Sequence, residues 1–205
     1  MSEVMSSKTK DKIIHTAIQL FNVFGTGAVS TNKIAKELGM SPGNLYYHFH
    51  NKEEIIRAIL DAMIADWDKL WLPLPKDWQP GLNDLKAIIR VNLQLQVKYR
   101  FFYRELITLM QLDPELKHIH QHIQEQRVEE QKKFFQLFVD AGIIQLQVPS
   151  EFDALLTACW IISNYWLSFL ETSGVEVDDS QIEQGIQLIM TVLRPYIAVE
   201  ELAGE

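Results

Sequence analysis

Apolar residues recur every three or four positions along most of this 205-residue chain. No segment alternates with the period of two that is typical of β-strands, and no repeat or low-complexity segment interrupts the pattern. The pattern predicts an all-α fold of about nine helices. The first predicted helix, Lys10–Phe24, has a broad apolar face and ends at Gly25.

Residues 31–49 predict two short helices joined by a three-residue turn. Gly39 can end the first helix with a positive φ, Ser41 can cap the second, and Pro42 suits its first position. One face of each helix is apolar and is predicted to point inward: Ile34, Ala35, Leu38, Leu45 and Phe49. The outward positions hold small or hydrogen-bonding residues, namely Gly43, Asn44, Tyr46, Tyr47 and His48. Such groups reach phosphates and base edges, so the segment predicts a helix-turn-helix that sets its second helix into the DNA major groove.

A longer helix is predicted to follow Asn51, which can form a capping box with Glu54. Its apolar positions, which close a three-helix core, are Ile55, Ile56, Ile59 and Leu60. The helix is predicted to continue to Trp71, where a proline-rich segment stops it. It would therefore join a DNA-binding head to the remainder of the chain.

The remainder of the chain is also predicted to be helical. The expected helices are Asn83–Tyr99, Phe101–Leu112, Pro114–Ala141, Glu151–Ser173 and one that ends before Pro195. Asp113 is expected to cap the third of these, and a capping box of Ser180 and Glu183 is expected to begin the last. Residues 154–170 are apolar on nearly every face, so that helix needs to be covered on all sides.

Three stretches carry a resemblance to a known family: AIQLFNVFG, STNKIAKELGMSPGNLYYHF and NKEEII. With them, residues 10–60 resemble the DNA-binding domain of the TetR family of bacterial transcriptional repressors. The resemblance covers about a quarter of the chain. It implies a DNA-binding head, residues 1–51, and a helical ligand-binding and dimerisation body, residues 52–205, in which relatives share little sequence.

The resemblance also implies which residues contact DNA. Carried over position by position, the contacts of the second short helix are Asn44, Tyr46, Tyr47 and His48, while Pro42 and Gly43 allow close backbone approach. Thr31, Lys33 and Lys52 are expected to hold phosphates. Many relatives carry a basic residue near Gly43, which this chain lacks, so fewer charged contacts with DNA are expected.

The net charge of −8 would be unusual for a nucleic-acid binder, but its distribution resolves the conflict. Residues 1–57 carry seven basic and five acidic residues, a net +2, whereas the remainder carries 12 and 22, a net −10. The single cysteine, Cys159, excludes an internal disulfide framework and is expected to be a buried thiol. No signal-peptide pattern is visible, and the apolar stretch from Leu155 to Leu170 is short for a membrane span, so a cytoplasmic protein is expected.

The body is predicted to form a homodimer and to bind a small, mostly apolar effector. The last two helices are the expected interface, through Trp160, Ile161, Ile182, Ile186, Ile189 and Leu193. Candidate pocket residues are aromatic or apolar, with one amide: Trp71, Phe102, Leu106, Met110, Trp160 and Asn164. Effector binding that rotates the long helix would change the separation of the two recognition helices on an inverted-repeat operator and so release it.

Two alternative functions remain open at this point, and an enzyme is not expected. His118 and His122 lie four residues apart and could form a metal pair in a metal-sensing regulator, but the polar residues around them favour a solvated helix face. A helical binding module without DNA activity is the second alternative. The sequence holds no phosphate-binding glycine loop, nucleophile elbow or HExxH motif, so no enzyme, no cofactor and no resident metal are expected.

Overall fold

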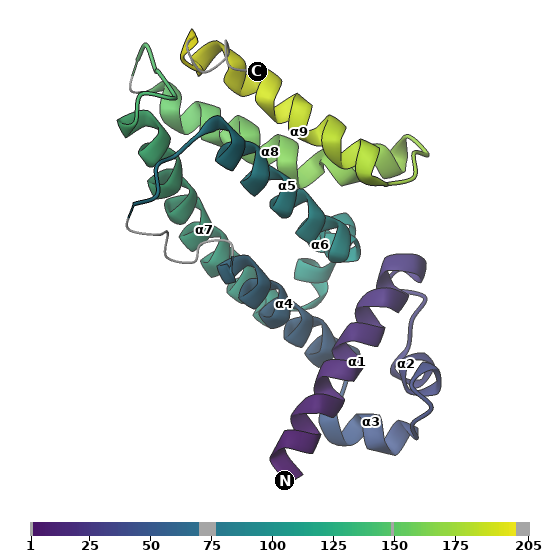
Figure 1. Ribbon diagram of the computed structural model, residues 1–205. Coiled ribbons are helices and arrows are strands. Elements are labelled where there is room, and N and C mark those ends of the chain that lie inside the picture. The colour runs from purple at the N-terminus through teal and green to yellow at the C-terminus, as the bar shows by residue number, and fades with distance from the viewer. Residues whose placement is uncertain (1, 70–76, 149, 200–205) are drawn as a thin grey trace. The chain divides into compact units, whose positions relative to one another are not determined.

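The computed structural model describes residues 2–69, 77–148 and 150–199. The described chain is helical, as predicted: α1 (Ser2–Phe24), α2 (Thr31–Glu37), α3 (Pro42–His48), α4 (Lys52–Asp68), α5 (Leu82–Lys98), α6 (Arg100–Leu112), α7 (Pro114–Asp140), α8 (Glu151–Thr172), α9 (Asp179–Leu193) and a final 3₁₀ turn (Arg194–Tyr196) (Figure 1). None of the helices in these ranges combines the length and apolar character that a membrane crossing requires.

The chain divides into two compact units. The first, unit 1, contains residues 1–66 and 98–120. Here α1 to α4 enclose an apolar core in which Phe21, Ile34 and Ile59 have no exposed surface. Helix α6 lies against the C-terminal part of α1, where the rings of Phe21 and Phe101 are 5.1 Å apart (Figure 1).

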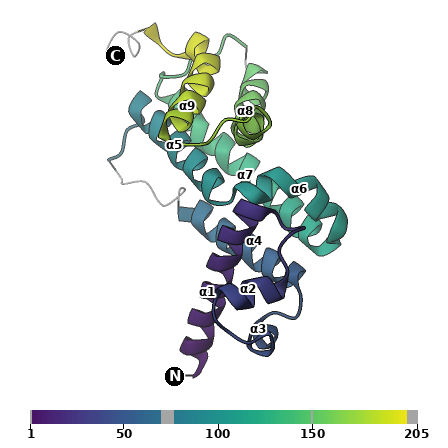
Figure 2. The same ribbon diagram turned by 90° about the vertical axis from the view of Figure 1, so that its right-hand side faces the viewer.

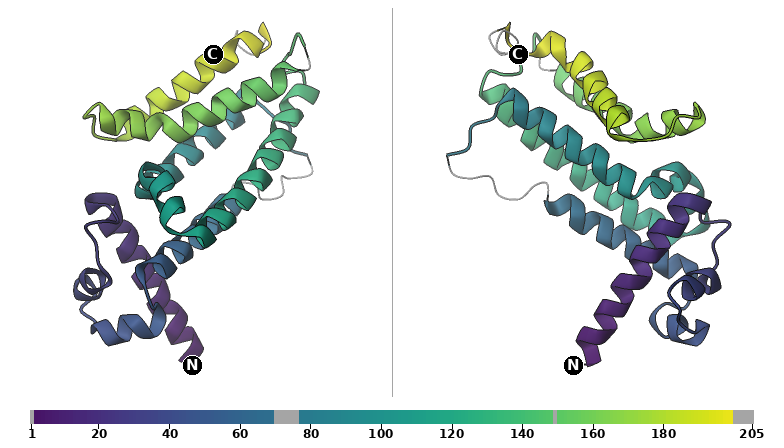
Figure 3. Two further views of the ribbon diagram at one scale, coloured as in Figure 1. Left: turned by 180° about the vertical axis from the view of Figure 1, so that it is seen from behind. Right: turned by 45° about the vertical axis from the view of Figure 1, so that its right-hand side comes forward.

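The second compact unit, unit 2, contains residues 67–97 and 121–205. Its helices α8 and α9 run side by side, and α5 packs beside them (Figures 2 and 3). The core includes Leu93, Phe138 and Leu193, none of which is exposed. Gly185 on α9 permits close approach, because an added Cβ would lie 2.7 Å from Nε1 of Trp166 and 2.9 Å from Leu93.

Local signals in the head are confirmed. Gly39 has φ +64°, the Ser41 hydroxyl accepts a hydrogen bond from the backbone N–H of Asn44, and Asn51 caps α4 by accepting from the N–H of Glu54 at 2.8 Å. The reciprocal half of the predicted capping box is different: Glu54 accepts from the N–H of His50 at 2.8 Å, one residue before the cap. This hydrogen bond lowers the pKa of the Glu54 carboxyl.

The starts of α1 and α9 differ from the predictions by more than one residue. Helix α1 begins at Ser2, eight residues before the predicted start, because residues without apolar periodicity can extend a helix that is already nucleated. The capping box of α9 is formed by Asp178 and Gln181 instead of Ser180 and Glu183. Asp178 accepts from the N–H of Ser180 at 2.7 Å, while Glu183 forms an ion pair with Arg90. Trp71, the predicted end of the long helix, lies outside the described residues.

Candidate nucleic-acid interface

Helix α3 is fixed to unit 1 by two apolar side chains and by its cap. Leu45 is 2% exposed and Phe49 is 5% exposed, so one face of the helix is held against the core. Ser41 caps its first turn, and Pro42 occupies a position where no intrahelical N–H donor is needed. The opposite face of α3 is therefore held in a defined orientation without being covered.

The uncovered face of α3 carries the side chains that the sequence places outward. Tyr46 is 59% exposed, Tyr47 is 77% exposed, and Asn44 is also exposed, which confirms their predicted orientation. Each phenol ring has an aromatic neighbour: Tyr46 meets His50 at 5.1 Å and Tyr47 meets His48 at 5.2 Å between ring centroids. His48 itself is only half-exposed, and its Nδ1 is buried. Any outward hydrogen bond of this imidazole therefore uses Nε2.

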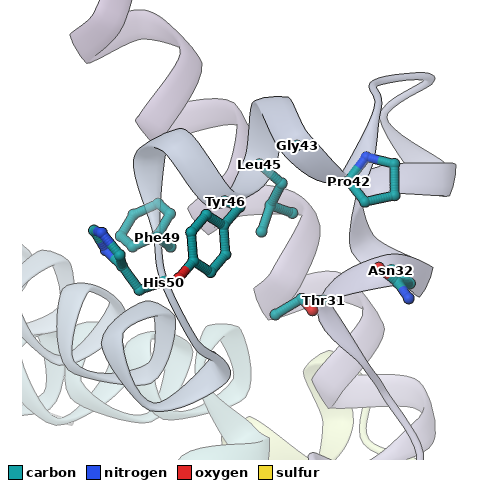
Figure 4. Close-up of a pocket in the computed structure, with 8 residues that line it drawn as sticks. All are labelled: Thr31, Asn32, Pro42, Gly43, Leu45, Tyr46, Phe49 and His50. Atoms are coloured by element: carbon teal, nitrogen blue, oxygen red, sulfur yellow. The ribbon is translucent and has the colours of Figure 1, made fainter.

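A hollow of about 290 Å³ lies between the start of α2 and α3 (Figure 4). Its lining residues are Thr31, Asn32, Pro42, Gly43, Leu45, Tyr46, Phe49 and His50. The predicted contacts Thr31, Pro42, Gly43 and Tyr46 are thus brought together. Asn32 and His50 belong to the same surface. No periodic pattern in the sequence marks them, because their relation to α3 arises only in three dimensions. The side-chain amide of Asn32 is exposed, and such an amide can form hydrogen bonds with a base edge.

The two lysines predicted to hold phosphates have partners inside unit 1. The ammonium of Lys33 lies 3.5 Å above the centre of the Phe24 ring. The ammonium of Lys52 donates a hydrogen bond to the backbone carbonyl of Thr26 at 2.6 Å. Neither residue lines the hollow. Both charges remain near the candidate surface, but part of their hydrogen-bonding or electrostatic capacity is used within the protein.

The loop after α1 is clamped by α6. The carboxylate of Glu105 accepts from the backbone N–H of Thr26 at 3.1 Å and from its hydroxyl, and Arg104 donates to the same carboxylate at 3.2 Å. Arg104 also donates to the carbonyl of Phe21 at 3.0 Å. Thr26 is 7% exposed. Together with Lys52, these contacts join α6, the loop after α1 and the start of α4.

The predicted pocket residues are divided between the two units. Phe102, Leu106 and Met110 belong to unit 1, and Trp160 and Asn164 belong to unit 2. Phe102 is fully buried between Phe101 and His120. The side-chain amide of Asn164 donates a hydrogen bond to the carbonyl of Trp160 on its own helix at 2.8 Å.

Four residues predicted to form the dimer interface are covered by their own chain. Ile182, Ile186, Ile189 and Leu193 are at most 6% exposed and pack in the core of unit 2. This burial corrects the prediction, because these side chains have little surface left for a partner. Of the other two, Ile161 is 52% exposed and Trp160 is partly exposed.

The histidines and the cysteine do not form a metal centre. Within the described ranges, no group of three or more His, Cys, Asp or Glu residues is arranged to hold a metal ion. His118 and His122 are exposed, and His122 has a hydrogen-bonding contact with Gln126 at 3.2 Å. Cys159 is buried, as predicted, and its burial raises the pKa of the thiol to about 11.

Comparison with protein families places both parts of the chain in one group. The family described as bacterial regulatory proteins, tetR family, matches residues 13–59, and the TetR family described as bacterial transcriptional repressor matches residues 69–204.

Among curated relatives, the transcriptional regulator QacR of Staphylococcus aureus is 42% identical over 62 residues, which are 30% of this chain and 33% of QacR. The class A tetracycline repressor from transposon 1721 of Escherichia coli is 34% identical over 62 residues, 30% of this chain and 29% of that protein. The chain thus matches about a third of the length of these curated relatives.

Solved structures extend the similarity over the whole chain. A TetR-family transcriptional regulator from Marinobacter aquaeolei superposes with a TM-score of 0.85 at 33% identity, covering 95% of this chain and 96% of that one. The complex of SmeT with triclosan has a TM-score of 0.68 at 17% identity, covering 95% and 94%, which establishes a shared fold.

Proposed function

Because this chain belongs to the TetR family of bacterial regulatory proteins, in which it is a DNA-binding transcriptional regulator, we propose that it is a ligand-responsive repressor. It acts as a homodimer on an inverted-repeat operator and leaves the operator when a small, mostly apolar molecule binds to residues 52–205. The observation that carries the proposal is the uncovered face of α3. On this face Asn44 and Tyr47 are exposed to solvent, while the opposite face of the helix packs against the core.

The exposed side chains divide into two roles. An asparagine amide can form a bidentate pair with adenine, so Asn44 and Asn32 read base edges. Tyr47 reads bases beside Asn44, whereas Tyr46, His48 and Thr31 donate to phosphates and fix the register of α3. Lys33 and Lys52 add positive charge at the start of α2 and α4. Pro42 and Gly43 keep the backbone close to the DNA.

The dimer is proposed to form through the exposed apolar face of α8 together with the exposed Leu188 on α9. Ile161, Tyr165 and Phe169 recur every four residues on α8 and are 52%, 62% and 60% exposed, and Leu188 on α9 is 40% exposed. Apolar patches of this kind mark protein interfaces. A two-fold axis then places two copies of α3 about 34–36 Å apart, which requires an inverted repeat.

The dimer is tested by sedimentation equilibrium. Tyr165→Glu should shift the protein from dimer to monomer, and Gln126→Glu, an exposed change on α7, should not. A wild-type protein that sediments as one protomer at all concentrations would remove the dimer from the proposal.

The effector is proposed to be mostly apolar because the candidate pocket residues are aromatic or aliphatic: Trp71, Phe102, Leu106, Met110 and Trp160, with Asn164 as one polar group. Similar proteins support the idea that such bodies bind small molecules, since one solved structure is a complex of SmeT with triclosan and a curated relative is named a tetracycline repressor. Native mass spectrometry of protein purified without denaturation should reveal a co-purified small molecule. Adding that molecule should release operator DNA.

DNA recognition is tested by selecting duplexes from a random-sequence library with the purified protein. The selected sites should contain an inverted repeat. Asn44→Ala should then cost about 1–3 kcal/mol of binding free energy and relax the preference at one position of each half-site. Gln94→Ala, an exposed polar change on α5, is the matched control. A variant Asn44→Ala with unchanged affinity and preference would contradict the assigned role of α3.

A further inference from the structure

The recognition surface contains little positive charge of its own. Residues 30–50 hold two lysines and one glutamate, a net +1. Of these two lysines, Lys33 lies over the Phe24 ring and Lys36 is exposed near the end of α2; Lys52, which follows this range at the start of α4, donates to the Thr26 carbonyl. Most of the affinity of proteins for duplex DNA comes from lysine and arginine contacts to phosphates. A DNA-binding head with this surface therefore needs cations from another element.

A short segment of positive charge lies on α1, before the buried part of that helix begins. Residues 7–12 have the sequence SKTKDK, which carries three lysines and one aspartate, a net +2 within six positions. Lys8, Lys10 and Lys12 are all exposed. We call residues 7–12 the basic arm.

The basic arm is helical although the core does not hold it. Among the described side chains of α1, Ile13 is the first that is fully buried, and those of residues 7–12 are exposed except Thr9, which is partly covered. At about 1.5 Å per residue, the six residues of the arm span roughly 9 Å along the helix axis. A length of this kind is comparable with the width of the DNA major groove, about 12 Å.

The arm also lies on the side of unit 1 that carries α3. The ammonium of Lys10 is 5.7 Å from the centre of the ring of Phe49, the residue that directly follows α3. In Figure 1 and in the left view of Figure 3, α1 passes close to one end of α3. The arm is therefore close to the end of the helix that is proposed to enter the major groove.

We propose that the basic arm is a second DNA contact, in which Lys8 and Lys10 hold phosphates that flank the site covered by α3. Lys12 adds charge nearer to the core. The contact supplies affinity without sequence information, because phosphates are the same at every step. It adds to the small positive charge of α2 and α3, and it rests on the proposed function, since it requires that α3 bind duplex DNA.

The test measures the salt dependence of binding to a duplex selected by the wild-type protein. Each lost phosphate contact makes the slope of log K against log salt shallower by about 0.9. The variant K8Q/K10Q should therefore show a slope shallower by at least about 0.9 per bound protomer between about 50 and 200 mM KCl. The control K117Q/K133Q removes the same charge from exposed positions on α7 and should keep the wild-type slope. Circular dichroism should show unchanged helix content in both variants, apart from fraying of the arm.

A second measurement locates the contact. Duplexes with single neutral methylphosphonates should weaken wild-type binding at phosphates outside the α3 site, and K8Q/K10Q should be insensitive to the same replacements. Equal slopes for wild type and K8Q/K10Q, or the absence of such flanking phosphates, would overturn this proposal while leaving recognition by α3 intact. A wild-type protein that selects no duplex at all would overturn both.

Discussion

Replacing Glu105 by glutamine should weaken the clamp between α6 and the loop after α1. The Glu105 carboxylate accepts from the N–H and the hydroxyl of Thr26, and it also accepts from Arg104. A glutamine side chain has the same size but only one acceptor oxygen, and its amide N–H groups would face these donors. At least one hydrogen bond to a charged group is then lost.

The magnitude follows from the burial of the two partners. The Glu105 side chain is 21% exposed and Thr26 is 7% exposed, so water can replace the lost bond only in part. Hydrogen bonds to charged groups contribute about 1.5–3 kcal/mol. We expect Glu105→Gln to cost about 2 kcal/mol, which lowers the melting temperature by roughly 4–8 °C in a protein of this size.

The assay is a thermal melt combined with amide hydrogen exchange at Thr26. Glu129→Gln is the matched control, since Glu129 is 65% exposed and its nitrogen–oxygen distance to Lys132 is 3.9 Å. A double-mutant cycle of Glu105→Gln with Thr26→Val should give a coupling energy within about 0.5–3 kcal/mol. Additive effects of these two substitutions, or a melt of Glu105→Gln equal to that of Glu129→Gln, would refute the reasoning.

Three further outcomes are expected. Burial beside Phe102 lowers the pKa of His120, so as the pH falls this imidazole takes up a proton in the unfolded chain before it does in the folded protein. The free energy of unfolding should therefore decrease below about pH 6.5. His120→Gln should make the fall of the urea midpoint between about pH 7 and 5 shallower. Gly185→Ala should destabilise by about 1–3 kcal/mol in a thermal melt despite its better helix propensity, because the new Cβ would overlap Trp166. Burial raises the pKa of Cys159 to about 11, so at pH 8 an aromatic disulfide reagent should react much more slowly with the native protein than with protein in urea.

Short-range features of the head could be predicted from the sequence. Gly39, Ser41 and Pro42 each have a local preference that matches their position, and the apolar spacing of Leu45 and Phe49 identified the buried face of α3. These signals act within four residues, so they can be interpreted without knowing the tertiary structure.

Features that depend on distant parts of the chain could not be predicted. The sequence shows that Ile182 and Ile186 lie on an apolar face, but not whether the same chain or a partner covers it. The contact of Glu105 with Thr26 joins residues 79 positions apart. Asn32 was missed for the same reason, since its place beside Pro42 is created by the turn between α2 and α3.

The membership of α6 in unit 1 has a consequence for protein engineering. A fragment cut after residue 66 would lose the covering of Phe21 by Phe101 and the carboxylate that satisfies Thr26. Hybrid regulators that receive the DNA specificity of this protein should therefore be spliced from two separate pieces, residues 1–66 together with 98–120. A hybrid with a single crossover after α3 would receive α3 without α6, whose Phe101 packs against Phe21 of α1.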